Sequence, residues 1–174
     1  MGLSLAGTPL AAELLQLPAL STEAITALGV VAIVVLIGLS AFFSSSEIAF
    51  FSLPQHRIES MVEEGIPNAE TVKALKGDPH RLLVTILVGN NIVNIAMSSI
   101  ATALFGIYMS QGQAVVAATF GITAVVLLFG ESAPKSYAVE NTESWALTIA
   151  RPLKWSERLL YPLVVLFDYL TRVV

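Results

Sequence analysis

The sequence predicts an all-α integral membrane domain in which three helices cross the bilayer. Of its 174 residues, 55% are hydrophobic and 13% are charged, and the mean hydropathy is +0.77. A soluble domain carries about 25% charged residues. Long stretches lack any formal charge, and the basic residues gather beside only some of them. We expect residues 1–174 to form a single transmembrane domain.

The first predicted span covers about residues 24–46. It contains no charged residue, and it is rich in Val, Ile and Leu. About 20 apolar residues are enough to cross ~30 Å of hydrocarbon. Because no Lys or Arg precedes this stretch, it lacks the basic segment of a cleavable signal peptide. We therefore expect the span to remain in the mature protein.

A second charge-free stretch, between Arg81 and Glu131, is too long for one span. The polar residues 110–113 interrupt it with a typical turn composition. This predicts a second span over about 82–108 and a third over about 114–130. Pro134 follows the third span and cannot donate to the carbonyl four residues back, so the sequence predicts a helix break there.

The connection formed by residues 54–78 is predicted to be a helical hairpin on the cytosolic side. Gly65 is expected to end its first helix, and Asn68 to cap its second. Asp78 as the N-cap and Pro79 as the first helical residue then begin the second span.

Residues 136–174 are expected to form juxtamembrane helices on the inner membrane surface. The stretch 153–174 is long enough to span, but it contains five charged residues and Pro162. Aromatic residues of the kind enriched at membrane interfaces lie in and near it. They are Trp145, Trp155, Tyr161 and Tyr169.

The basic residues predict the orientation of the chain. All nine lie in or next to the 54–78 connection, or after the third span. The positive-inside rule then places the N-terminus outside and the C-terminus in the cytosol of a multi-pass plasma-membrane protein. The basic residues form no continuous run, so nucleic acid is not expected as a partner. The absence of cysteine excludes disulfides and thiolate metal sites.

Each predicted span carries a cluster of oxygen-bearing residues. The clusters are Ser44, Ser45, Ser46 and Glu47 in the first span, Asn90, Asn91 and Asn94 in the second, and Gly130 and Glu131 at the end of the third. An ionisable group in hydrocarbon costs at least about 2.5 to 3.5 kcal/mol, so it normally faces a partner, a cavity or an ion path.

Helical spacing places several of these groups together. Asn90 and Asn94 are four residues apart and share a face of the second span. In the first span, Ser40, Ser44 and Glu47 share a face by the same rule. Hydroxyl, amide, carbonyl and carboxylate oxygens suit Mg²⁺ or Na⁺ and do not suit zinc or copper. The sequence therefore predicts an intramembrane cation site.

Structural interpretations compete with this prediction. A single serine in a span usually bonds to a carbonyl of its own helix. Glu47 is also compatible with a span end, Asn91 with interhelical packing, and Glu131 with an ion pair to Lys135. An intramembrane serine hydrolase, and enzymatic activity generally, are not expected, since both histidines lie outside the predicted spans.

A row of small residues continues the spacing of Asn90 and Asn94. It consists of Ser98, Thr102 and Gly106. Small residues let helices approach closely, so this row is a candidate packing face within the subunit or in a dimer.

Three motifs resemble the transmembrane (DUF21) domain of the CorC and cyclin-M (CNNM) magnesium transporters. They are FFSSSEIAFFSL at 42–53, ILVGNNIVNIAMSSIAT at 86–102 and FGESAPKSYA at 129–138. The resemblance covers about residues 36–169. It implies a homodimeric Mg²⁺ exporter, coupled to Na⁺, with three spans, an outside N-terminus and a juxtamembrane helix belt.

Carried onto matching positions, the resemblance implies a transported Mg²⁺ held by Ser44, Asn90, Asn94 and Glu131, with a backbone oxygen near Gly130. Because three serines follow one another, any of residues 44–46 could face the ion. Members of this family usually continue into cytosolic CBS modules, which this chain does not contain and the full-length protein is expected to have. The rival interpretation is a membrane anchor or assembly scaffold in which Asn and Ser serve packing.

Overall fold

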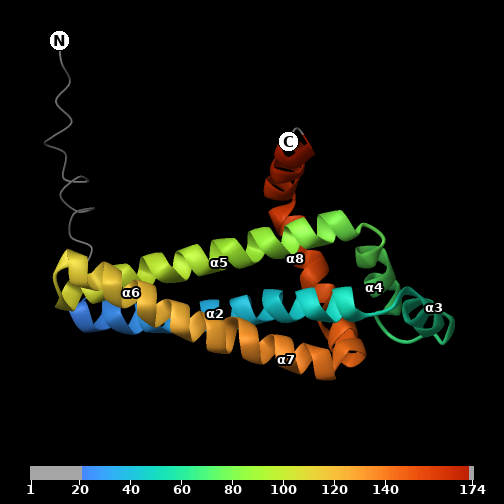
Figure 1. The fold of residues 1–174 in the computed structure, drawn as a ribbon, viewed down its shortest axis with the longest axis horizontal. Helices are drawn as coiled ribbons and strands as arrows, with labels where there is room; N and C mark the ends of the chain where they lie inside the picture. Colours follow the sequence, from blue (N-terminus) through green and yellow to red (C-terminus); the bar gives the residue numbers. More distant parts are fainter. Residues whose placement is uncertain (1–20, 173–174) are drawn as a thin grey trace, which may run out of the picture.

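The computed structural model describes the backbone of residues 21–172 and the side chains of residues 21–167. Every regular element in this part of the chain is helical (Figure 1). The elements are α2 (Thr22–Ser52), α3 (Gln55–Glu63), α4 (Ala69–Lys76), α5 (Pro79–Tyr108), α6 (Gln111–Val125), the π-helix η1 (Val126–Ser132), α7 (Ala133–Glu140) and α8 (Thr142–Arg172).

Three helical segments are long and apolar enough to cross a membrane, which confirms the predicted fold class. They are Thr22–Ser52, Pro79–Tyr108 and Gln111–Glu140. At a rise of ~1.5 Å per residue, a helix of this length extends for about 45 Å, which exceeds the hydrocarbon core. The helices therefore run beyond the predicted spans, because helical bonding continues past the apolar stretch.

The third span is continuous, so the predicted break at Pro134 is wrong. η1 joins α6 to α7 directly, and the N–H of Ala133 donates to the carbonyl of Leu128, five residues earlier. Pro134 lies in the first turn of α7. A π-helical segment shifts the bonding from four residues to five, and the helix passes through the proline without interruption.

The first two spans pack closely through small residues. The ring of Phe43 on α2 occupies the space that a Cβ atom at Gly89 of α5 would need. Near the N-terminus of α2 and the C-terminus of α5, the hydroxyl groups of Thr26 and Tyr108 are 2.8 Å apart. The opposite face of α2 exposes a row of valine and leucine side chains, as expected where lipid surrounds the helix.

The α3–α4 hairpin lies beyond the C-terminal end of α2 and the N-terminal end of α5 (Figure 1). Gly65 has a φ of 68°, a left-handed conformation that glycine adopts readily. Asn68 occupies the N-cap position of α4, but its side chain makes no capping bond. It donates instead to the carbonyl of Leu147 at 3.0 Å. Asp78 caps α5 as predicted, since its side chain accepts from the N–H of Arg81.

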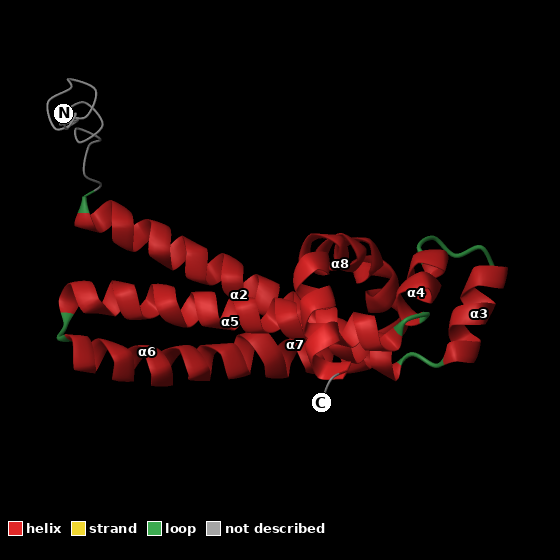
Figure 2. Cartoon of the chain, turned by 90° about the horizontal axis from the view of Figure 1, so that it is seen from above, coloured by secondary structure: helices red, strands yellow, loops and turns green. Residues whose placement is uncertain are grey.

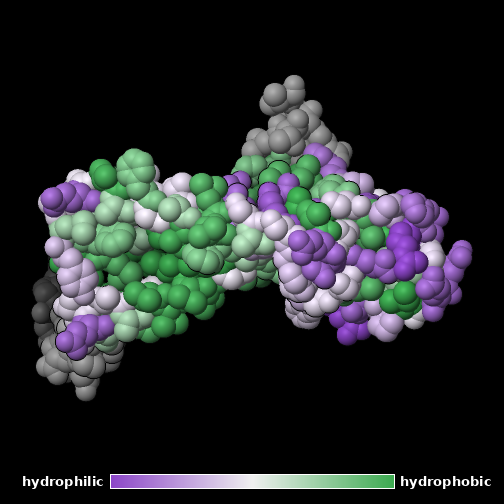
Figure 3. All heavy atoms as spheres, turned by 60° about the horizontal axis from the view of Figure 1, so that its bottom comes forward, coloured by the Kyte–Doolittle hydropathy of each residue, from purple (hydrophilic) through white to green (hydrophobic). Residues whose placement is uncertain are grey.

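The α8 helix crosses the spans near the end at which the hairpin lies (Figures 1 and 2). It contacts α2, α4 and α5, and Pro152 and Pro162 lie inside it. It is not among the segments that could span. Trp155 is 71% exposed, whereas the side chain of Tyr169 lies outside the described residues. Hydrophobic surface covers the spans and hydrophilic surface gathers at the hairpin end (Figure 3).

Candidate functional site

Ser40 on α2 joins the two asparagines of α5. Its hydroxyl is fully buried and lies 3.1 Å from the Oδ1 atoms of both Asn90 and Asn94. A hydroxyl has one proton to donate, so the two amide oxygens share it. Both oxygens therefore converge on one point of α2, at the depth where the sequence predicts an ion site.

The third span reaches the same point through Gly130. A Cβ atom at this residue would lie 2.8 Å from the Oγ atom of Ser40. A side chain there would displace the Ser40 hydroxyl or push the two helices apart. Gly130 belongs to η1, so the π-helical segment brings the third span against Ser40. One serine thus marks the place where all three spans meet.

The three serines in the C-terminal part of α2 differ in their hydrogen bonds. The hydroxyls of Ser45 and Ser46 both donate to the carbonyl of Phe42, at 3.1 and 2.6 Å. Ser44 is 1% exposed, and its hydroxyl has no hydrogen-bond partner among the described residues. A buried polar group without a partner costs about 1 to 3 kcal/mol. Of the three, Ser44 is the hydroxyl available to a ligand.

Two carboxylates near this site, those of Glu47 and Glu131, differ in whether they form an ion pair. Lys135 does not pair with Glu131, as one interpretation of the sequence allowed. Its Nζ atom lies 3.0 Å from Oε2 of Glu47. Glu131 is half-buried and makes no hydrogen bond or ion pair with the described residues. Of these two carboxylates, that of Glu131, which adjoins Gly130 in the chain, is therefore uncompensated among the described residues.

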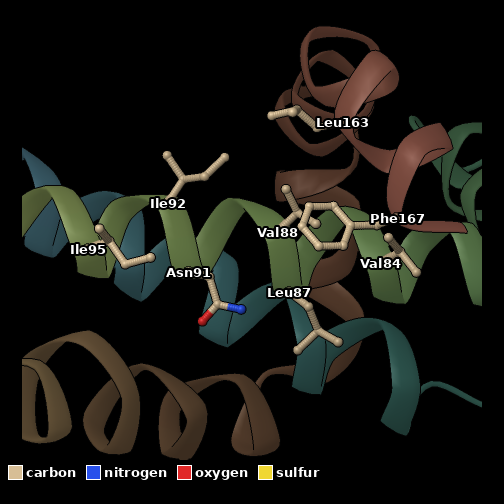
Figure 4. A pocket seen from close by; sticks show the side chains of 8 residues that line it. All are labelled: Val84, Leu87, Val88, Asn91, Ile92, Ile95, Leu163 and Phe167. Atoms are coloured by element: carbon tan, nitrogen blue, oxygen red, sulfur yellow. The ribbon is translucent and has the colours of Figure 1, made fainter. Parts of the chain in front are cut away.

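Asn91 lies away from this cluster. It is exposed and lines an apolar pocket of about 410 Å³ between α5 and α8 (Figure 4). Leu163 and Phe167 form the α8 side of that pocket. The structure thus separates Asn91 from Asn90 and Asn94, which contact Ser40.

The row of small residues on α5 makes little internal contact. Ser98 and Gly106 are exposed, and a Cβ atom at Gly106 would meet nothing within 4 Å. Thr102 donates to the carbonyl of Ser98 on its own helix at 2.8 Å. Packing of this row against a second subunit stays a prediction.

Helical spacing placed Ser40 on one face with Ser44 and Glu47, but sequence reasoning gave it no part in the ligand set. Ser40 lies four residues before Ser44. This spacing places both hydroxyls on one face of the first span. The role itself depends on the packing of α2 against α5, which helical spacing does not reveal.

Ion pairs and hydrogen bonds hold the α3–α4 hairpin against the rest of the domain. The guanidinium of Arg57 donates from Nε and Nη2 to the carboxylate of Glu143 on α8, at 2.8 and 2.7 Å. These bonds raise the pKa of Arg57 and lower that of Glu143. Lys76 donates to the carbonyl of Leu53, and burial lowers its pKa.

The N-terminal end of α5 is also joined to α8 by contacts of a charged side chain. Nε of Arg81 lies 2.6 Å from Oε1 of Glu157, and its guanidinium carbon lies 5.0 Å from the centre of the Tyr161 ring. The hairpin, the start of the second span and α8 are therefore connected at one end of the molecule.

Three membrane-crossing helices that meet at a buried serine hydroxyl and two half-buried asparagine amides define a multi-pass membrane domain with a polar centre. The family model for the cyclin M (CNNM) transmembrane N-terminal domain matches residues 31–174. The chain belongs to this family, which confirms the resemblance seen in the motifs.

Curated relatives agree with this assignment. A chloroplastic DUF21 domain-containing protein of Arabidopsis thaliana is 38% identical over 141 residues, covering 79% of this chain and 21% of the relative. The UPF0053 inner membrane protein YfjD of Escherichia coli is 35% identical over 136 residues, covering 78% and 32%. A UPF0053 protein of Haemophilus influenzae is 34% identical over 140 residues, covering 80% and 33%. The chain thus spans a fifth to a third of the length of these relatives.

Proposed function

We propose that this chain is the membrane domain of a Mg²⁺ transporter, which exports Mg²⁺ in exchange for Na⁺ and catalyses no chemical reaction. One observation carries the proposal: neutral oxygens from α2 and α5 converge beside η1, where Glu131 is an uncompensated carboxylate. Such a cluster is expensive in a membrane unless a cation completes it.

The proposed ligands are side-chain and backbone oxygens. Mg²⁺ prefers octahedral oxygen coordination and usually keeps some of its water. Asn90 and Asn94 would supply amide oxygens, Ser44 its unpartnered hydroxyl and Glu131 its carboxylate. The backbone oxygen of Gly130 would complete the set. Gly130 lies in the π-helical segment, and π-helical turns occur frequently at functional sites.

Weak binding is part of the proposal. Four neutral oxygens and one carboxylate offset less of the dehydration cost of Mg²⁺ than a cage of several carboxylates would. A transport site must bind strongly enough to admit the ion and weakly enough to release it. Na⁺ takes the same class of oxygen ligands, which is compatible with exchange at a shared site.

The proposed orientation has the N-terminus outside and the hairpin and α8 in the cytosol of a homodimeric plasma-membrane protein. The concentration of Lys and Arg at the hairpin end supports this direction. Because the chain has no cysteine, single-cysteine labelling tests it directly. Ser110→Cys should react with an impermeant reagent in intact cells, and Glu63→Cys only after permeabilisation. The reverse pattern would contradict the orientation.

Mg²⁺ flux through proteoliposomes tests the function. We expect Asn94→Ala and Glu131→Gln in the full-length protein to reduce flux at least about tenfold, equivalent to ~1.4 kcal/mol. Asn91→Ala is the matched control and should retain flux, since this side chain lies outside the cluster. Wild-type flux in well-folded Asn94→Ala and Glu131→Gln proteins would contradict the proposed ion site.

The second candidate is a membrane anchor or assembly scaffold. The hydrogen bonds of Ser40 to Asn90 and Asn94 favour it, since polar groups also hold helices together in membranes. It predicts that Asn94→Ala weakens folding or assembly, while the wild-type protein shows no Mg²⁺-specific flux or thermal stabilisation.

A further inference from the structure

We propose that the ammonium group of Lys135 competes internally with the transported cation, by exchanging between the carboxylates of Glu47 and Glu131. The inference rests on the proposed function, and it assigns to Lys135 a role in loading and release of the ion. It starts from the ion pair between α2 and α7.

This ion pair lies next to the candidate ligands on both helices. Lys135 follows Glu131 by four residues, and Glu47 follows Ser44 by three. Both spacings correspond to about one helical turn. The distance of 3.0 Å between Nζ and Oε2 joins side chains that are only about a third exposed, at 35% and 34%. The pair therefore bridges the two helices one turn inward from the site.

One ammonium group is shared by two carboxylates. A lysine four residues after a glutamate is within reach of it on a helix surface. In this structure Lys135 pairs with Glu47, and Glu131 has no ion-pair partner among the described residues. The observed arrangement is thus the one in which Glu131 is open to a cation.

In the alternative arrangement, Lys135 pairs with Glu131 while no cation occupies the site. When the ion leaves, a lone carboxylate at membrane depth is costly. Movement of Lys135 to Glu131 neutralises that charge and releases Glu47. Glu47 then attracts the next cation at the inner mouth. When Lys135 returns to Glu47, Glu131 becomes available again.

The two charge-neutralising variants are expected to act in opposite directions. Lys135→Gln removes the competitor, so the KM for Mg²⁺ should fall about fivefold. Its kcat should also fall, because no ammonium group replaces the departing ion. Glu47→Gln frees Lys135 to occupy Glu131, so the KM should rise about fivefold. In the double variant the competitor is absent, and the KM should follow that of Lys135→Gln.

A purely structural ion pair predicts something different. Removing either partner would then weaken the same contact between α2 and α7. Both single variants would shift the KM in the same direction, and the double variant would resemble both.

The test uses the full-length protein in liposomes, with Mg²⁺ alone as the transported cation and initial rates measured across a concentration series. Thermal stabilisation by Mg²⁺ in detergent gives a second readout that does not depend on flux. Opposite shifts for Glu47→Gln and Lys135→Gln support the exchange. Shifts in the same direction, or no shift in either, overturn it.

Two controls keep this test separate from the proposed function. Loss of flux in Asn94→Ala with parallel shifts at Glu47 and Lys135 overturns the exchange alone. Wild-type flux in both Asn94→Ala and Glu131→Gln overturns the proposed function. Lys135→Arg keeps the charge and should stay within about twofold of wild type. If Lys135→Gln does not fold, Glu47→Gln is judged against Lys135→Arg, and equal KM values overturn the exchange.

Discussion

The hydroxyl of Ser44 is expected to affect stability and ion binding with opposite signs. Because it is buried without a partner, Ser44→Ala should stabilise the ion-free protein by up to about 1 kcal/mol. The same change should weaken Mg²⁺ binding. Thermal unfolding in detergent, measured with and without Mg²⁺, checks both effects.

Ser46→Ala is the matched control for this prediction, since the Ser46 hydroxyl bonds to a carbonyl of its own helix. Its response to Mg²⁺ should equal that of the wild type. A Ser44→Ala protein that Mg²⁺ stabilises as strongly as the wild type would remove this hydroxyl from the ligand set.

Ser40 is expected to orient the amide groups of Asn90 and Asn94. Ser40→Ala removes the shared donor, and each hydrogen bond contributes about 0.5 to 1.5 kcal/mol. We therefore expect lower thermal stability and a KM for Mg²⁺ raised about fivefold. Ser45→Ala removes only a bond within α2, and it should leave the KM unchanged. Equal KM values for the two variants would contradict the orienting role.

The residues of the site were predictable in type, but their contacts were not. Asn90, Asn94 and Glu131 stand out because polar groups are rare in a charge-free stretch, and spacing alone places the two asparagines on one face. The choice of Ser44 among three serines depends on which hydroxyls find helix carbonyls. The pairing of Lys135 with Glu47 depends on the rotation of α7 against α2. Neither follows from one helix considered alone.

At the scale of the helices, the contact between α2 and α5 depends on Gly89. Its missing side chain leaves room for the ring of Phe43, which is 6% exposed. Gly89→Ala should destabilise the domain by about 1 to 3 kcal/mol, because an added methyl group overpacks a tight contact. Thermal unfolding in detergent measures this.

Gly106→Ala is the control for Gly89, since nothing lies within 4 Å of the added atom in the described structure. This variant should keep its thermal stability. A loss of dimer in Gly106→Ala, measured by light scattering, would identify the exposed row on α5 as a subunit contact.

The helices themselves were largely predictable. The charge-free stretches, the turn at residues 110–113 and the cap formed by Asp78 and Pro79 define three spans and their order. The continuation of the helix through Pro134 was not predictable from hydrogen bonds between residues four apart. The π-helical segment changes that spacing, and the packing of Gly130 against Ser40 accompanies the change.

At the scale of the whole molecule, docking of the hairpin on α8 should depend on pH through Glu143. The hydrogen bond from Arg57 holds the pKa of Glu143 below its ordinary value of 4.5. The contribution of this contact is therefore complete above the ordinary value, and it is lost as the pH falls through the depressed value. Hydrogen exchange of α3 across this range should show the loss.

Glu143→Gln should abolish this pH dependence and leave α3 less protected at neutral pH. Glu140→Gln is the control, because Glu140 makes no ion pair among the described residues. A pH response in Glu143→Gln equal to that of the wild type would assign the effect to another group.

The seven π-helical residues from Val126 to Ser132 also set the rotation, about the helix axis, of the residues that follow them. An α-helix turns by about 100° per residue. A wider π-helical turn rotates less per residue, and it therefore changes the direction in which later side chains point. Restoring regular α-helical bonding through these residues, with none deleted, would rotate Lys135 by about 100° away from Glu47. It would also redirect α8, which starts at Thr142. One short stretch of helix thus aligns both the ion-pair face of the third span and the direction of α8.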